Sequence, residues 1–457
     1  MAPSTQPRSE AAGPGGALQA NPVGAKRSTV ILGLLIRGVA AVIIVAAPFV
    51  QTKALLWPAI VILVFTWLTS WLSRVFCRWH YDELYELRAD TKDGEDDDAA
   101  LPGVTVIAPA RNEEEGIEEA ARSLGHLDYP NIEIIIVNDH STDGTRALLE
   151  RVQSEIPKVR VLHDPPLQEG WLGKANAVWF AVQHANPDNK WLVLTDGDVV
   201  FEPKTIRRAV AHAEAAGWDF FTCVPFLDNG SFSEELLLPH AWRDIIVASS
   251  LRLLNKPEGR PIGIGAFILV KRAAYLESGG HSAIRNQQPE DTLLGGVVKK
   301  WGGKIGVGWT SSMLRVRLYR GYAQLRSFLV RKTRVAVDDS LLSLASRALY
   351  CWLLFVLPIV LGTSTLIYEA VNWSVTPLMA CYTLAALGVY VDVARAMRQA
   401  SAVSRMRPGL PWIHPLGGLL RFWLTVVAMG QVLAKKRMDW RGRDFSNVRA
   451  EKDAPTG

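Results

Sequence analysis

Two apolar blocks, one near each end of the chain, constrain its fold more than any other feature. The first runs from about Thr29 to Phe76 and divides near Gln51 into two segments of roughly 20 residues, enough to span the hydrocarbon core of a bilayer. The second holds three further segments: Ala345–Tyr368, Thr376–Val393 and Leu416–Leu433. The chain has 457 residues, of which 49% are hydrophobic and 16 are Trp. We therefore expect a protein that is part membrane-embedded and part globular.

The first block fits two transmembrane helices at residues 29–77. Arg37 interrupts the first helix, so we expect its guanidinium to reach the interface or a polar partner. Trp57, Trp67 and Trp71 are placed to anchor the second helix at the bilayer surface. The alternative is a pair of buried core helices. Residues 1–28 are rich in Ala, Gly, Pro and Ser and are predicted to be a disordered tail.

Basic residues predict the orientation in the membrane. Lys26 and Arg27 favour a cytoplasmic N-terminus, and two crossings then return the chain to the cytoplasm. Basic stretches also lie on both sides of Leu416–Leu433, and both should be cytoplasmic; they contain Arg395, Arg398, Arg405 and Arg407, then Lys435, Lys436, Arg437, Arg441 and Arg443. We therefore predict that residues 341–435 contain two spans plus a third segment that is re-entrant or interfacial, or else a third span.

This layout predicts a multi-pass protein of the inner cell membrane. Residues 436–457 would be a basic cytoplasmic tail, and the central region would also be cytoplasmic. The net charge of +5 is mild for this length, so no nucleic acid partner is expected. The four cysteines form no C-x-x-C pair, which argues against a disulfide framework or a zinc site. The acidic residues 91–98 are predicted to be a solvated linker.

Residues 100–335 alternate between short apolar runs and helical patterns. The predicted strands are Val104–Ala108, Ile132–Val137, Val159–Leu162, Trp191–Thr195, Phe220–Val224 and Ala266–Val270. The predicted helices between them include Glu113–Leu124, Thr142–Gln153 and Ala175–His184. This alternation predicts an α/β domain with a mainly parallel sheet covered on both faces. Ligands bind beyond the carboxyl ends of such strands, so residues just after each strand are the candidates for function.

Polar residues follow the first two predicted strands. The segment Ala110–Glu113 comes directly after the first strand, and Asp139 comes after the second. The Asp139 carboxylate is suited to accept a hydrogen bond from a nucleobase imide. A simpler interpretation is that both segments are turns, with Ser141 or Thr142 capping the next helix.

Two further motifs concern phosphate and metal. Lys174 lies at a helix start and is suited to reach a nucleotide, but no P-loop glycines precede it. Asp196 and Asp198 flank a glycine after an apolar strand, and Mg²⁺ or Mn²⁺ prefers such oxygen ligands. Alone, the Asp-Gly-Asp segment equally fits an ordinary turn.

The pair Glu290–Asp291 precedes a helix. Asp291 is suited to cap that helix or, if partial burial and neighbouring negative charge raise its pKa, to act as a general base.

The ordered set of these motifs, over residues 103–320, resembles the inverting nucleotide-sugar glycosyltransferases of family 2, which have the GT-A fold. The resemblance implies a GT-A (nucleotide-diphospho-sugar transferase) domain flanked by transmembrane helices. It also implies specific roles. Substrate contacts would come from Ala110, Arg111, Glu113, Asp139, Lys174, Asp196 and Glu290. A divalent metal, Mg or Mn, would be held by Asp198 with Asp196, and Asp291 would be the catalytic base.

The membrane layout resembles two groups within that family, the bacterial hopanoid-associated glycosyltransferases and, more distantly, the ceramide glucosyltransferases. Their C-terminal pattern is present here as Trp440, Gly442, Arg443 and Phe445, with Asp444 inserted. The Q-x-x-R-W motif of polysaccharide synthases is absent, which argues against processive synthesis. Arg331, Lys332 and Arg334 occupy that region without the Trp. They are placed to touch either the donor diphosphate or lipid headgroups, and we expect lipid headgroups.

The resulting hypothesis is an enzyme that transfers a hexose from a nucleotide sugar, taken to be a UDP-sugar, to a lipid in the membrane, such as a hopanoid or another glycolipid precursor. A polyprenyl phosphate acceptor, a growing polysaccharide and a non-catalytic membrane scaffold are the alternatives. The sequence leaves open the sugar, the acceptor and the oligomeric state.

Overall fold

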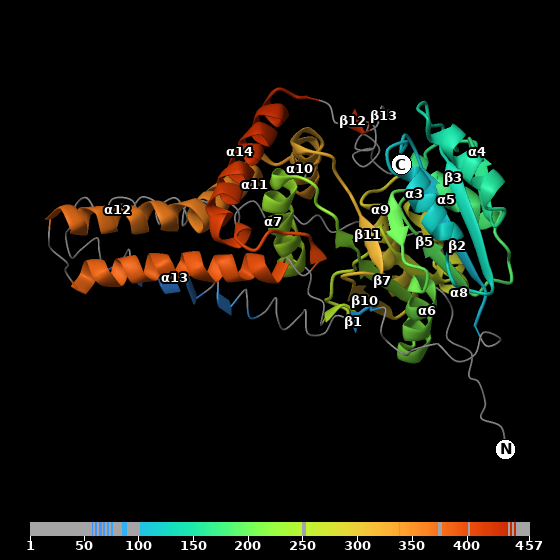
Figure 1. Ribbon diagram of the computed structural model, residues 1–457, viewed down its shortest axis with the longest axis horizontal. Coiled ribbons are helices and arrows are strands. Elements are labelled where there is room, and N and C mark those ends of the chain that lie inside the picture. The colour runs from blue at the N-terminus through green and yellow to red at the C-terminus, as the bar shows by residue number, and fades with distance from the viewer. Residues whose placement is uncertain are drawn as a thin grey trace, which may run out of the picture.

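The computed structural model has an α/β body at one end and a long helical hairpin at the other (Figure 1). The structure describes residues 85–88, 101–248, 253–337, 339–372, 377–400, 403–436, 439–440 and 443–444, and scattered positions between 57 and 75. The predictions for residues 1–28, for Arg37, for the acidic residues 91–98 and for most of residues 29–77 and 436–457 concern residues outside the described part of the chain.

The body is built on a sheet of eight strands in the order β1-β10-β7-β9-β5-β2-β3-β4. The six predicted strands are present as β2 (Val104–Ala110), β3 (Ile132–Asn138), β4 (Val159–His163), β5 (Trp191–Leu194), β7 (Phe220–Val224) and β9 (Ile268–Lys271). All neighbours pair in parallel except β9, which runs antiparallel between β5 and β7. The predicted mainly parallel sheet is therefore confirmed.

Several short strands escaped the sequence prediction. The eight-stranded sheet is completed by β1 (Tyr85–Glu86) and β10 (Ile305–Trp309). A second sheet joins β6 (Val199–Phe201), β11 (Leu314–Val316) and β8 (Phe226–Leu227). These runs have two to five residues, too few to establish an alternating pattern, and β10 contains two glycines.

Helices cover both faces of the large sheet. They are α3 (Ile117–Gly125), α4 (Thr145–Glu155), α5 (Gly173–Gln183), α6 (Thr205–Ala216), α8 (Arg272–Glu277) and α9 (Glu290–Trp301), with the 3-10 helix η3 (Gly280–Ile284). The helices predicted to start at Glu113 and Thr142 instead start at Ile117 and Thr145. Both starts are later because the preceding residues form turns that bind each other, as described below.

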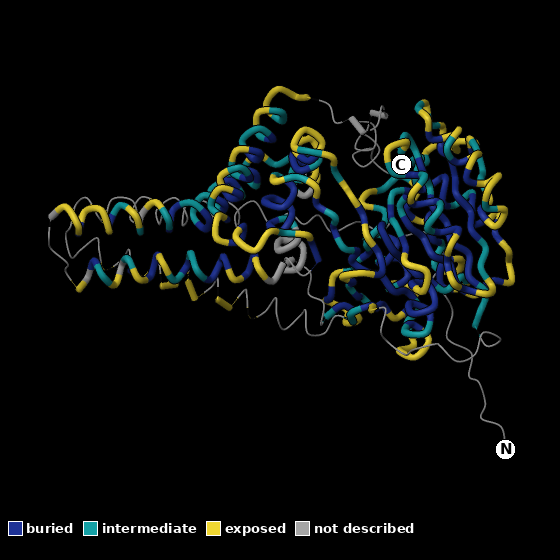
Figure 2. Tube along the Cα trace, viewed as in Figure 1, coloured by how far each residue is buried: buried dark blue, intermediate teal, exposed yellow. Residues whose placement is uncertain are grey.

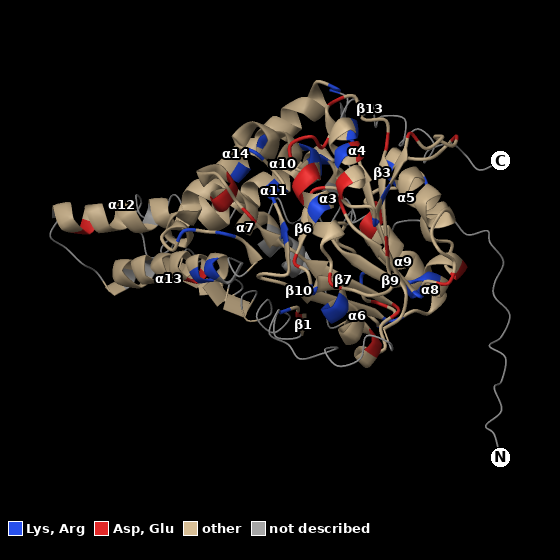
Figure 3. Cartoon of the chain, turned by 45° about the vertical axis from the view of Figure 1, so that its right-hand side comes forward, with Lys and Arg blue, Asp and Glu red and all other residues tan. Residues whose placement is uncertain are grey.

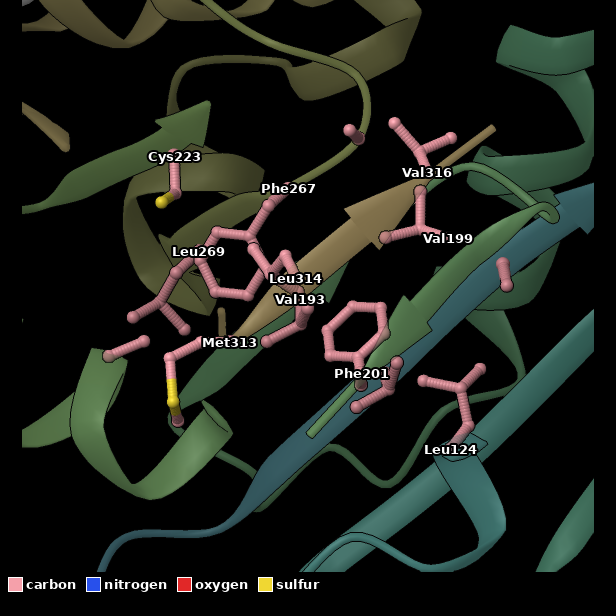
Figure 4. Packing of buried hydrophobic residues seen from close by; sticks show 14 of the residues in the cluster. Leu124, Val193, Val199, Phe201, Cys223, Phe267, Leu269, Met313, Leu314 and Val316 are labelled. Atoms are coloured by element: carbon pink, nitrogen blue, oxygen red, sulfur yellow. The ribbon is translucent and has the colours of Figure 1, made fainter. Parts of the chain in front are cut away.

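Strand residues alternate between two hydrophobic cores. On β3, Ile134 and Ile136 face one core, whereas Ile135 and Val137 face the other. The first core also takes in the second sheet, and its Phe201, Phe267 and Leu314 are shown in Figure 4. This core continues without a break into helices of the C-terminal region, because Leu325 and Leu424 belong to it. The α/β body and the inner C-terminal helices thus share one core.

The helical region joins elements from distant parts of the chain. It comprises α7 (Phe232–Ala248), α10 (Tyr322–Ala336), α11 (Leu341–Cys351), a π-helical turn (Trp352–Val356), α12 (Leu357–Asn372), α13 (Pro377–Ala400), the 3-10 helix η6 (Leu410–Ile413) and α14 (His414–Leu433). Within the described residues, three helices are long and apolar enough to cross a membrane: Leu341–Val371, Met379–Arg398 and Leu410–Leu433. The first and third helices contain the predicted segments Ala345–Tyr368 and Leu416–Leu433, and the second covers Thr376–Val393 from Met379 onward.

Large apolar side chains remain exposed along α12 and α13, which form the hairpin, and along α14 (Figure 2). Ile367 is 64% exposed and Leu384 is 65% exposed. The outer part of the hairpin carries one acidic residue, Glu369, whose side chain is buried (Figure 3). Among the described N-terminal positions, Trp57, Trp67 and Trp71 are exposed, and Trp67 lies against α13 at Gly388. Surfaces of this kind suit lipid rather than water.

The basic loop predicted between the second and third segments is shorter than expected. Arg395 and Arg398 lie in α13, which extends to Ala400. Arg405 and Arg407 form ion pairs with Asp228 and with a carboxylate in the first turn of α7, Glu235. Arg405 is therefore bound by the α/β body and Arg407 by the start of α7.

Candidate active site

The carboxyl edge of the sheet carries unusual backbone conformations. Asn112, His140 and Asp164 follow β2, β3 and β4, and each has a positive φ, between 49° and 55°. Side chains other than glycine rarely adopt this conformation, although Asn, Asp and His tolerate it best. Unusual backbone conformations cluster at functional sites, so three such residues at neighbouring strand ends indicate that this edge of the sheet has a functional role.

The turns after β2 and β3 bind each other. The Asn112 backbone N–H donates to the Ser141 hydroxyl at 3.1 Å, and the Thr142 N–H donates to Asn112 Oδ1 at 2.8 Å. The Glu113 N–H donates to Thr145 Oγ1 at 2.8 Å. The suggestion that Ser141 or Thr142 caps α4 is therefore wrong, because these side chains hold the neighbouring turn and the N-cap position belongs to Gly144.

These two turns position the predicted substrate-contacting residues. The Asp139 N–H donates to the Ala110 carbonyl at 2.8 Å, and Arg111 Nη1 donates to the Asp139 carbonyl at 2.9 Å. The Asp139 side chain is 5% exposed, and its Oδ1 lies 3.0 Å from His140 Nδ1. The structure thus brings Ala110, Arg111 and Asp139 together, and adds His140, which we did not single out from the sequence.

A second group surrounds Lys174, in the first turn of α5. Its Nζ lies 2.6 Å from Asp196 Oδ1 and 2.9 Å from Glu290 Oε1. Burial by itself lowers the pKa of Lys174, but Asp196, Glu290 and Asp291 together raise it well above its ordinary value. The Lys174 side chain is 38% exposed and that of Asp196 is 35% exposed, so solvent also reaches this group. Lys174 therefore links the strand end after β5 to the start of α9.

Asp291 lies beside this group, in the first turn of α9. Its Oδ2 accepts a hydrogen bond from the Gly265 N–H at 3.1 Å, and its Oδ1 accepts one from the Thr292 N–H at 2.7 Å. The helix N-cap is Pro289, so the suggestion that Asp291 is the cap residue is wrong. Burial and then the negative charge of Glu290 raise the pKa of Asp291 to about 6. A carboxylate with this pKa is suited to take a proton near neutral pH.

Gly265 lies next to Lys174, Asp196 and Asp291. A Cβ added there would lie 3.2 Å from both Asp196 Oδ2 and Lys174 Nζ, and 3.5 Å from Asp291 Oδ2. Because three predicted site residues converge on this one backbone position, a side chain would fill the region that they face. We did not select Gly265 from the sequence, and the available signal was the Gly263-Ile264-Gly265 segment just before a strand.

Asp198, two residues after Asp196, lies close to Gly116 at the start of α3. A Cβ added at Gly116, next to the start of α3, would lie 3.7 Å from Asp198 Cβ, and one at Gly197 would lie 3.1 Å from the Pro109 carbonyl. Across the part of the chain that the structure describes, no group of three or more His, Cys, Asp or Glu side chains could hold a metal. Asp196 and Asp198 fit a divalent cation only as a partial oxygen donor set, which phosphate oxygens of a bound substrate would have to complete.

The basic residues of α10 have different surroundings. Arg334 is 5% exposed and binds both carboxylate oxygens of Asp339, at 2.9 and 3.1 Å. The expectation that Arg334 meets lipid headgroups is therefore wrong. Burial lowers the pKa of Lys332, and the negative charge of Asp291 opposes that change.

Comparison with known proteins finds relatives of the α/β body. Residues 105–279 match the family model described as glycosyl transferase family 2. A beta-monoglucosyldiacylglycerol synthase from Nostoc sp. is 34% identical over 103 residues, which cover 22% of this chain and 19% of that protein. A 4,4'-diaponeurosporenoate glycosyltransferase from Staphylococcus aureus is 24% identical over 221 residues, which cover 48% of this chain and 54% of that protein. The chain thus spans about half, or less, of the length of these relatives.

Among solved structures, a mannosyltransferase from Pyrobaculum calidifontis in complex with GDP-Man and Mn2+ is similar. The superposition covers 88% of this chain and 99% of that chain, with a TM-score of 0.45 and 18% identity.

The family match and the relatives confirm, at the level of the domain, the predictions of a transferase enzyme and of a GT-A α/β fold. Residues 105–279 of this chain are therefore similar in sequence to glycosyl transferase family 2.

Proposed function

We propose that this protein transfers a sugar from a nucleotide-sugar donor to a hydroxyl group of a membrane lipid, with inversion at the anomeric carbon. One observation carries the proposal: Asp291, with a pKa of about 6, faces the same bare glycine as Lys174 and Asp196. A base close to donor-binding groups is the arrangement that a single displacement needs.

The donor is assigned to the carboxyl edge of the sheet. The two mutually bound turns, with Ala110, Arg111, Glu113 and Asp139, would hold the nucleoside. Their rigidity supports this role because a pre-ordered site loses little entropy when the ligand binds. Lys174 would exchange part of its contact with Asp196 and Glu290 for the donor phosphates. Asp198, with Asp196, would hold Mg or Mn, which as a Lewis acid stabilises the charge of a leaving diphosphate.

The acceptor is assigned to the membrane. Three apolar helices suited to a bilayer adjoin the body, and one relative is named as a glucosyldiacylglycerol synthase. A hydroxyl acceptor requires a base, whereas a polyprenyl phosphate does not, so the raised pKa of Asp291 favours the hydroxyl. Among lipid hydroxyls we propose the hopanoid type, on the overall resemblance to that group. The proposed setting is the inner cell membrane, with the catalytic domain in the cytoplasm.

The test is a transfer assay on the purified full chain in lipid nanodiscs. The protein would be incubated with a panel of UDP- and GDP-sugars, with Mg²⁺, Mn²⁺ or a chelator, and with total bacterial lipid that includes hopanoids. We expect one sugar to appear in one lipid species, and the chelator to abolish the transfer. If sugar is transferred only to polyprenyl phosphate, the acceptor is a polyprenyl phosphate and not a lipid hydroxyl. If the protein shows no transfer and binds no nucleotide, the result would support the scaffold alternative.

A further inference from the structure

We propose that α14 does not cross the membrane and instead lies along the bilayer surface on the side of the catalytic domain. In this arrangement the α12–α13 hairpin penetrates the bilayer, and the outer side of α14 rests on lipid. The inference concerns how the chain sits on its membrane, so it holds whatever sugar or acceptor the enzyme uses.

The start of α14 is tied to the α/β body. Ser404, ten residues before the helix, forms a parallel β-bridge with Leu227 at the end of β8. Asn229 Nδ2 donates to Ser404 Oγ at 2.6 Å. The Arg407 backbone N–H and side chain both donate to Glu235, in the first turn of α7. The chain therefore enters α14 from the surface of the catalytic domain.

The end of α14 is tied to the same part of the molecule. Arg334, near the end of α10, donates to the Lys436 carbonyl at 3.1 Å and to Gln431 Oε1 at 3.4 Å. At the start of α10, the Gly321 N–H donates to Glu234 Oε1 at 2.7 Å, next to the residue that binds Arg407. Helices α10 and α14 therefore begin near the same turn of α7 and end beside each other.

Helix α10 is unsuited to the interior of a bilayer. It carries exposed Arg326 and Lys332. Charged side chains are costly at the centre of a bilayer. Helix α14 runs beside α10, and both of its ends are fixed. It therefore has to lie at the same depth relative to the membrane as α10, outside the bilayer interior.

The inner side of α14 is packed against protein. Gly417, Arg421, Leu424 and Ala428 are buried at helical spacing, and Leu424 and Ala428 belong to the core of the α/β body. Arg421 Nη1 donates to the His240 carbonyl on α7 at 3.2 Å. The arginine that interrupts this apolar segment is thus bound within the protein.

The outer side of α14 is apolar and exposed. Leu416, Leu419 and Trp423 recur every three or four residues and are 43%, 46% and 54% exposed. Trp412, just before the helix, is 47% exposed. Tryptophan is enriched where hydrocarbon meets headgroups, so this row suits the bilayer surface.

The direction of α14 agrees with this placement. In Figures 1 and 3 the α12–α13 hairpin extends away from the body, whereas α14 runs across its base. If the hairpin stands upright in the bilayer, α14 is then inclined away from the hairpin, toward the side of the body. This also answers the conflict between basic stretches on both sides of the segment, because both remain on the catalytic side.

The experiment is a cysteine-accessibility map of the full chain. Cys77 and Cys381 would be replaced by serine, and single cysteines introduced by Gly409→Cys, Lys436→Cys, Ser154→Cys on α4, and Ser374→Cys between α12 and α13. Spheroplasts and inverted vesicles would be treated with a membrane-impermeant maleimide. We expect the first three positions to react from one side and Ser374→Cys from the other. Lys436→Cys reacting from the side of Ser374→Cys would overturn the proposal, as would all four reacting from one side.

A depth measurement gives a second, independent readout. A fluorophore attached at Leu419→Cys should be quenched at least twofold more strongly by a lipid quencher near the headgroup than by one near the acyl-chain end. The matched position Leu366→Cys on α12 should show the opposite preference. Equal deep quenching at both positions would show that α14 is inserted like α12. Because neither readout needs activity, an inactive protein would count against the proposed function only.

Discussion

The α/β body and the helical region both contain charged side chains that are shielded from solvent in part or in full, but they use them differently. In the body, Lys174, Asp196, Glu290 and Asp291 gather around a bare glycine, and solvent still reaches Lys174 and Asp196. In the helical region, Arg334 and Arg421 are enclosed and bound by a carboxylate, an amide and backbone carbonyls. A charge that faces open space is available to a substrate, whereas an enclosed, fully bound one fixes the packing of helices. The following experiments test that distinction.

The largest effect is expected at Asp291. Asp291→Asn removes the proposed base, so the rate of transfer should fall by about 10²–10⁴-fold. The melting temperature and the dissociation constant of the donor should stay close to those of the wild type. Turnover, thermal denaturation and calorimetric titration with the donor nucleotide would measure the three quantities. Asp188→Asn, on an exposed turn, is the control. Near-normal turnover in Asp291→Asn would remove Asp291 from the mechanism.

The next effect concerns stability rather than rate. Arg334→Met leaves Asp339 without its bidentate partner, and breaking a buried ion pair costs about 3–5 kcal/mol. We expect a clear drop in thermal and denaturant stability, measured on the protein in lipid nanodiscs. Arg326→Met, at an exposed position of the same helix, should change stability little. Equal stability of the two variants would mean that the helical region does not depend on its buried charge.

A smaller effect is expected at the glycine between the site residues. Gly265→Ala places a methyl group 3.2 Å from Asp196 Oδ2 and Lys174 Nζ, which is closer than ordinary contact. Transfer should slow by about tenfold to a hundredfold, because a shift of about 1 Å between reacting groups can lower the rate by up to about a hundredfold. Nucleotide binding should be retained. Gly296→Ala on α9 meets its nearest neighbour at 3.4 Å and is the control. Unchanged turnover in Gly265→Ala would show that the sugar lies elsewhere.

The smallest effect is a shift of the pH profile. A base with a pKa of about 6 is protonated below that pH, so transfer should decline as the pH falls through 6. The negative charge of Glu290 raises the pKa of Asp291 and the positive charge of Lys174 lowers it. Glu290→Gln should therefore move the acid limb to lower pH, and Lys174→Met to higher pH. Rate measurements between pH 4.5 and 9, roughly, would show both. A shift of both variants in the same direction would contradict this electrostatic account.

The sequence predicted most of the sheet because buried parallel strands are continuous apolar runs. Val104–Ala110 and Phe220–Val224 were recognised in this way, as were the ends of strands as places for functional residues. The strands of the second sheet were missed since each has two or three residues. The starts of α3 and α4 were predicted too early, because the turn at residues 111–114 is held by the turn at residues 139–145. That contact joins residues about 30 positions apart.

For the site and the helical region too, the sequence predicted local features but not contacts between distant residues. Glu290 and Asp291 were named from the sequence, but not the proximity of Lys174, which comes from the first turn of α5. His140 carries no signal of its own in a single sequence, and the one signal for Gly265 was the Gly263-Ile264-Gly265 segment before a strand. Arg334 was expected at headgroups, although it is enclosed by Asp339, Gln431 and the Lys436 carbonyl.

The amino-acid sequence by itself determined the α/β class, the order of the motifs and the apolar character of the C-terminal helices, since periodicity and composition are local properties. Only the tertiary structure decided which charges meet. The Lys174–Glu290 contact, the hydrogen bond from Gly265 to Asp291 and the ties of α14 to α7 and α10 all join distant parts of the chain. Such contacts depend on how elements pack, and packing is a property of the folded chain as a whole.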